Sequence, residues 1–140
     1  MSRVLRRGRP RGQALVEFAL VIPIFVLLIF GLVDLGRTVF VNNSVAEAAR
    51  DGARHASVQA RAYDSTSRDA VEDWVLDRLE GVPNPSVTVE CTPVTPALGC
   101  TVNDIVVVTV HSDMEWVTPI IGNLMGPLSL EGRSEVIVNN

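Results

Sequence analysis

The sequence of 140 residues is short of the side chains that carry most enzyme chemistry. It contains two cysteines and two histidines, with no glycine-rich phosphate loop, no nucleophile elbow and no cluster of histidines with carboxylates. A small hydrolase therefore lacks both a nucleophile and a base. We expect a protein that is not an enzyme, with no catalytic residues, no cofactor and no metal.

Charge is missing from one stretch and acid from another. No charged side chain occurs from Phe18 to Val33, and the first twelve residues hold five arginines without an acid. The rest of the chain has seven arginines against 16 acids. The net charge of -4 is therefore the sum of +5 in the first twelve residues and -9 in the remainder. The basic leader has no interleaved aromatics, and no helix-turn-helix pattern follows it, so we expect no nucleic-acid partner.

The uncharged run is long enough to cross a bilayer. A helix from Ala14 to Leu35 would be about 33 Å long at ~1.5 Å per residue, against a hydrocarbon core of about 30 Å. The run is longer than the core of a secretory signal, and no small-x-small cleavage site follows it directly. The preceding arginines predict a cytoplasmic N-terminus in the inner (cytoplasmic) membrane. We predict a basic cytoplasmic leader at 1–12, a transmembrane helix at 13–36 and an extracytoplasmic α+β domain at 37–140.

One carboxylate lies where a bilayer disfavours it. Glu17 follows Gly12 by five residues and stands at the start of the apolar helix, where a buried charge costs up to ~3 kcal/mol. Either this side chain reaches water at the interface, or it neutralises a positive partner. A cut after Gly12 would supply one, the new amine of Gln13.

The segment GQALVEFALVIP, from Gly12 to Pro23, resembles the processing region of class IV prepilins, and most closely the TadE-like proteins of tight-adherence (Flp) pilus systems. In that family a basic leader ends in glycine, the fifth residue after it is Glu followed by an aromatic, and a Val-x-Pro step lies in the helix. The resemblance implies that Gly12 ends the leader, Gln13 begins the mature chain, and Glu17 with its neighbour Phe18 guides processing or subunit contact. It also implies a prepilin peptidase and other pilin-like subunits and pilus assembly proteins as partners, although Gln13 departs from the small or apolar residue of the pattern.

The helix is predicted to continue beyond the membrane. Small and apolar residues recur at helical spacing after Val33, and AARDGARHAS also resembles the post-membrane helix of TadE-like proteins. Ala48, Gly52 and Ala56 form a row that permits close helix packing, either on the chain's own domain, which we favour, or on neighbouring pilin-like helices. Asp34 and Arg37 are read as an ordinary solvated pair.

The remaining residues predict an α+β domain that resembles a pilin. DSTSRDAVEDWVLDRLEG predicts an amphipathic helix, and SVTVEC, DIVVVTVHS and LSLEGRSEVIVN predict three antiparallel strands. MEWVTPIIGNLMGP is a loop or short helix between the second and third strands. Its apolar side chains either cap the sheet, which we favour, or touch lipid; they are Trp116, Ile120, Ile121, Leu124 and Met125.

The two cysteines are predicted to form a disulfide. Cys91 and Cys100 are separated by eight residues that include two prolines and a glycine, and closing this loop would contribute about 2 to 3 kcal/mol in an oxidising compartment. A metal site with His111 is the weaker alternative, because no CxxC spacing is present.

Two functions fit these features. The first is a minor pilin-like (pseudopilin) component of a tight-adherence pilus assembly and secretion system. It would act through helix packing and domain contacts, with membrane lipid around its apolar helix. The second is a membrane-anchored extracytoplasmic binding domain unrelated to pili, which would need neither Gly12 nor Glu17.

Overall fold

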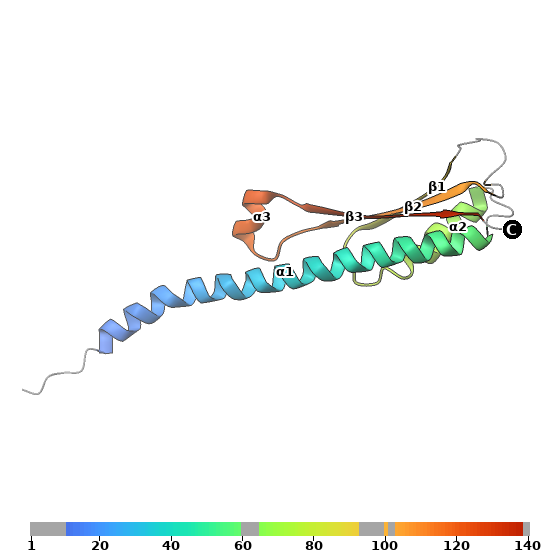
Figure 1. Ribbon diagram of the computed structural model, residues 1–140. Helices are drawn as coiled ribbons and strands as arrows, with labels where there is room; N and C mark the ends of the chain where they lie inside the picture. Colours follow the sequence, from blue (N-terminus) through green and yellow to red (C-terminus); the bar gives the residue numbers. More distant parts are fainter. Residues whose placement is uncertain (1–10, 60–64, 93–99, 101–102, 139–140) are drawn as a thin grey trace, which may run out of the picture.

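A long helix carries a small sheet along its C-terminal half (Figure 1). The computed structural model describes residues 11–59, 65–92, 100 and 103–138. The elements, in chain order, are α1 (Arg11–Gln59), α2 (Ser65–Leu76), β1 (Pro85–Thr92), β2 (Ile105–Met114), α3 (Pro119–Met125) and β3 (Leu128–Ile137). The predicted α+β class, with a long apolar helix and a three-stranded antiparallel sheet, is confirmed.

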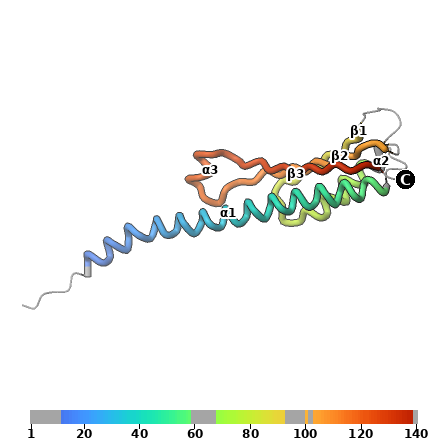
Figure 2. The backbone as a smooth tube through the Cα atoms, in the orientation of Figure 1, coloured from blue at the N-terminus to red at the C-terminus, as the bar shows by residue number. Residues whose placement is uncertain are grey.

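Helix α1 is continuous over 49 residues, through Pro23. Its N-terminal half projects away from the rest of the molecule (Figure 2), and its most apolar window is not buried by any other part of the chain. Side chains there are leucine, isoleucine, valine and phenylalanine on every side, and they are exposed. Such a helix suits an apolar surrounding, because its side chains are apolar on every side.

The three strands form an antiparallel sheet in the order β1-β2-β3. The register pairs Val89 with Val108 and Val110 with Gly132. Side chains alternate along each strand, so Val89 of β1 and Val106, Val108 and Val110 of β2 point into the core. Glu131 and Arg133 of β3 lie on the opposite face and are exposed, and Val107 of β2 lies on that face too, although it is buried. This alternation leaves one apolar face, and both α1 and α2 pack on it: α1 lies against β2 and β3, and α2 against β1.

Small residues let α1 lie close to the sheet. Ala48, Gly52 and Ala56 are buried, and a Cβ at Gly52 would stand 2.6 Å from Val75 Cγ2. The structure therefore places the small-residue row against the chain's own domain, through α2 and β2. Seven residues earlier along α1, a Cβ at Gly132 of β3 would stand 2.6 Å from the Val45 carbonyl oxygen.

Candidate assembly site along the membrane helix and its junction with the domain

The residues predicted for processing lie together at the start of α1. Gly12, Gln13, Glu17 and Phe18 are all exposed, and the Gln13 side-chain amide donates to Glu17 Oε1 at 3.5 Å. Within the residues that the structure describes, Glu17 has no ion pair. A positive group near Gln13 would therefore find an accessible carboxylate one helical turn away.

Gly12 lies in the first turn of α1, which begins at Arg11. Among the residues that the structure describes, nothing comes within 4 Å of a Cβ built on Gly12. Gly12 and Gln13 are both exposed, so no described side chain covers this point of the helix.

Asp34 forms the junction between the apolar part of α1 and the domain. Its Oδ1 accepts a hydrogen bond from the Val117 amide at 2.8 Å, and its Oδ2 accepts from the Thr118 amide at 3.0 Å and the Thr118 hydroxyl at 2.6 Å. Asp34 and Thr118 are each 1% exposed. Three donors compensate the burial of this carboxylate, which would otherwise be strongly unfavourable. We call this arrangement the Asp34 clamp.

Arg37 supports the clamp one turn further along α1. Its guanidinium donates to the Glu115 carbonyl oxygen at 3.3 Å. The prediction that Asp34 and Arg37 form an ordinary solvated pair is therefore wrong for Asp34, because the carboxylate is buried against residues more than 80 positions away. One signal was present in the sequence: Asp34 ends the uncharged run directly, where a carboxylate without partners is costly.

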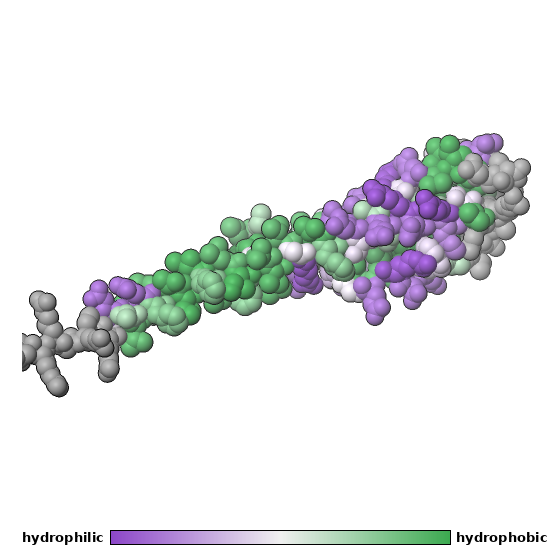
Figure 3. Space-filling view, turned by 60° about the horizontal axis from the view of Figure 1, so that its bottom comes forward, coloured by the Kyte–Doolittle hydropathy of each residue, from purple (hydrophilic) through white to green (hydrophobic). Residues whose placement is uncertain are grey.

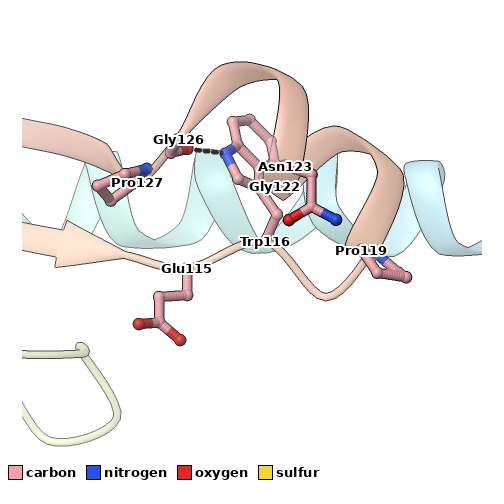
Figure 4. A pocket seen from close by; sticks show the side chains of 7 residues that line it. All are labelled: Glu115, Trp116, Pro119, Gly122, Asn123, Gly126 and Pro127. Atoms are coloured by element: carbon pink, nitrogen blue, oxygen red, sulfur yellow. Dashed lines mark hydrogen bonds between the residues drawn. The ribbon is translucent and has the colours of Figure 1, made fainter.

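Helix α3 is built around Trp116 (Figure 4). The Trp116 indole N–H donates to the Gly126 carbonyl oxygen at 2.7 Å and so links the two ends of the α3 segment. Gly126 has a φ of 72°, a conformation that favours glycine at the end of a helix. Trp116, Pro119, Gly122 and Gly126 also line a shallow pocket of about 330 Å³.

The outward side of α3 is apolar and exposed. Ile120 is 60% exposed, Leu124 84% and Met125 70%, and none of the residues of α3 is buried. The favoured prediction that these side chains pack in the core is therefore wrong, while Trp116 and Ile121 are partly covered. The physical reason is that Trp116 fills the inside of this short turn of chain, so the other side chains point away.

The disulfide is at the other end of the sheet. Cys91 in β1 and Cys100 are bonded, with their Cα atoms 5.7 Å apart, and both side chains belong to the buried core. Their thiols are therefore not available to a metal in this form. His111 lies on the solvent face of β2, with Nδ1 3.9 Å from Glu131 on β3. Within the described ranges no three metal-ligating side chains come together.

A stacked contact between α1 and α2 was not predicted. His55 stacks on Trp74 with ring centroids 4.0 Å apart and an angle of 1° between the planes. The Arg78 guanidinium carbon lies 3.3 Å from the Trp74 ring centroid, which sterically requires the opposite face of the indole. The contact adds cation–π stabilisation to the packing of α2 on α1.

Comparison with known families bears directly on the first of these regions. Residues 12–54 match the family model described as TadE-like protein. They form a TadE-like segment. The segment begins at Gly12, covers the exposed apolar part of α1 and the Asp34 end of the clamp, and reaches the small-residue row at Ala48 and Gly52. No curated protein and no solved structure matches the chain.

The TadE-like segment lies entirely within α1. It combines a region whose side chains are exposed within the described part of the chain and a region buried by the domain. The predicted resemblance is therefore confirmed for the apolar helix, which is long enough to span a membrane, and for its continuation. The α+β domain is attached to the last part of this segment by the sheet contacts of α1.

Proposed function

We propose that the chain is a minor pilin-like subunit of a tight-adherence (Flp) pilus assembly and secretion system, held in the inner membrane by α1 and acting by contact without catalysis. The observation that carries the proposal is the match of residues 12–54 to the TadE-like family. The same residues form a helix whose apolar half is unburied within the chain.

The exposed half of α1 supports a role in assembly. A helix that is apolar on every side can contact lipid while the protein is in the membrane, and can contact other apolar helices when subunits associate. Figure 3 shows the hydrophobic surface covering the slender part of the molecule, whereas the wider domain is mostly hydrophilic on the face shown. We propose other pilin-like subunits and pilus assembly proteins as the partners of this surface.

The proposed orientation places the N-terminus in the cytoplasm and the sheet outside. It is supported by the five arginines before Gly12 and by the disulfide between Cys91 and Cys100, which suits an oxidising compartment. In this orientation the peptide bond after Gly12 faces the cytoplasmic side of the membrane. We propose a prepilin peptidase as its partner there.

Glu17 is the residue that distinguishes this function from a simple anchor. A membrane-anchored binding domain unrelated to pili would gain nothing from a carboxylate at the start of the apolar helix, where insertion is disfavoured. In a pilin-like subunit, the same carboxylate pairs with the amine of Gln13 after cleavage, on its own chain or on a neighbour.

The test replaces Gly12→Leu and Glu17→Ala in the native host and measures the intact mass of the protein and the number of surface pili. Glu47→Ala is the matched control, because it removes an exposed carboxylate from the same helix outside the apolar run. We expect Gly12→Leu to retain the leader and Glu17→Ala to reduce piliation, with Glu47→Ala close to wild type. Unchanged processing and piliation in both variants would reject the proposed function.

A further inference from the structure

The apolar side of α3 is not used by the function proposed above. Ile120, Leu124 and Met125 are more than half exposed, although α3 is held in shape by the bond between Trp116 and Gly126. Apolar side chains exposed to water are less favourable than the same side chains in an apolar surrounding. An ordered helix that presents three large apolar side chains outward therefore calls for a covering surface.

The Asp34 clamp fixes where this surface lies. Val117 and Thr118 immediately precede α3, and both are bonded to Asp34, the first charged residue after the uncharged run of α1. Arg37 adds a second link through Glu115. In Figure 1, α3 stands at the end of the β2–β3 hairpin that points toward the apolar half of α1, away from the end of the sheet near the C-terminus.

We propose that α3 is a second membrane contact, lying in the outer interfacial layer of the bilayer beside α1 with Ile120, Leu124 and Met125 among the lipids. The proposal rests on the membrane-spanning role of α1 in the proposed function. If α1 crosses the bilayer, the clamp holds α3 at the level where α1 leaves it. The domain then touches the membrane at two points joined by the Asp34 clamp.

The composition of this region fits lipid. No charged residue occurs from Trp116 to Leu130, and a tryptophan with an apolar body and a polar N–H is typical of the membrane–water interface. Leu35, Val39 and Phe40 of α1 are also exposed, so apolar surface continues past Asp34 on the outer side. This continuity with the membrane-spanning run selects lipid as the occupant rather than a separate protein.

The charges that flank α3 define the kind of lipid. Glu115 and Glu131 bracket the uncharged stretch, and both are exposed. Arg37, which donates to the Glu115 carbonyl oxygen, is a base beside Glu115. A helix that binds anionic headgroups usually carries several basic residues on its own polar face, and none occurs from Trp116 to Leu130. The contact is therefore apolar, and zwitterionic lipid is sufficient for it.

The experiment measures the depth of a label on α3 in the full-length chain. Leu124→Cys is labelled with an environment-sensitive fluorophore under non-reducing conditions, and the protein is reconstituted in phosphatidylcholine vesicles. Nitroxides attached to the lipid headgroup or acyl chain then quench the label according to its depth. Two control labels are Leu28→Cys in the middle of the apolar run and Val58→Cys near the far end of α1, both exposed.

We expect the label at 28 to be quenched best by acyl-chain nitroxides. The label at 124 should be quenched by headgroup and upper-chain nitroxides several-fold more than the label at 58. Equal quenching at 124 and 58, with strong quenching at 28, would overturn the α3 proposal and leave the anchor intact. Weak quenching at 28 would reject the membrane-spanning role itself, and with it both proposals.

A second measurement separates lipid from another copy of the chain. Unlabelled Leu124→Cys protein is oxidised in vesicles at high lipid-to-protein ratio. We expect monomers, because lipid covers residue 124. Efficient disulfide-linked dimers together with absent lipid quenching at 124 would overturn the proposal in favour of a contact between subunits.

Discussion

The hydroxyl of Thr118 donates a 2.6 Å hydrogen bond to Oδ2 of Asp34, across 84 positions of the chain. Through this bond and the two amide bonds beside it, the start of the domain's α3 segment is fastened to the point where the apolar run of α1 ends. The domain is therefore held on α1 by polar contacts where the apolar run ends, and further along by packing of the sheet.

Replacement of Asp34→Asn should weaken the clamp. An asparagine keeps the size of the side chain, but its NH₂ group replaces one of the two acceptor oxygens that face three donors. Leaving one buried donor unpaired costs about 1 to 3 kcal/mol. We expect a loss of this size in the free energy of unfolding, measured by urea titration in detergent with tryptophan fluorescence.

The control for this variant is Glu47→Gln, an exposed acid on the same helix, which should leave the unfolding midpoint unchanged. Amide hydrogen exchange at Val117 and Thr118 should accelerate in Asp34→Asn and not in the control. Equal midpoints and equal exchange in both variants would show that the clamp does not hold the domain.

Gly132→Ala should destabilise the contact between β3 and α1. The added methyl would stand 2.6 Å from the Val45 carbonyl oxygen, which is backbone and cannot rotate away. Overpacking of this kind costs about 1 to 3 kcal/mol. Gly36→Ala is the matched control, since nothing lies within 4 Å of its Cβ and alanine is the better helix former.

The two glycine variants should therefore shift the urea midpoint in opposite directions. Gly36→Ala is expected to stabilise by up to about 1 kcal/mol. A midpoint for Gly132→Ala equal to or above that of wild type would contradict the close approach of α1 to β3.

Removal of the disulfide should destabilise the sheet without dismantling it. Cys91 and Cys100 close a short loop, with a sequence separation of 9, and a loop of this length contributes about 2 to 3 kcal/mol by restricting the unfolded chain. The double variant Cys91→Ser, Cys100→Ser should show this loss in urea, and reduction of the wild type should reproduce it. Identical stability with and without reductant would refute the contribution.

The elements of the domain could be predicted because their patterns are local. The run of β-branched residues in DIVVVTVHS indicated β2, and DSTSRDAVEDWVLDRLEG indicated α2. The helix is shorter than predicted, because it ends at Leu76 and Leu79 lies in the turn that follows. The uncharged run likewise indicated a helix that nothing in the chain covers. Each of these patterns involves residues that are close together in the sequence, so it can be recognised in one sequence without knowledge of the fold.

The environment of Asp34 and of α3 could not be predicted in the same way. Burial of the Asp34 carboxylate depends on hydrogen-bond donors at positions 117 and 118. The residues next to Asp34 in the sequence do not indicate which donors these are. The apolar residues of α3 were predicted to lie in the core because apolar side chains usually do. Composition alone does not indicate whether the chain itself or another surface covers them. In the structure, Trp116 fills the inside of the α3 turn and donates a hydrogen bond to Gly126. The other apolar side chains of α3 therefore point outward.

The most direct test of the assembly role is the count of surface pili in cells that lack this chain. We predict that deletion abolishes or strongly reduces piliation, and that the wild-type chain restores it whereas Glu17→Ala, at equal protein level, does not. Normal piliation in the deletion strain would contradict the proposed role in pilus assembly.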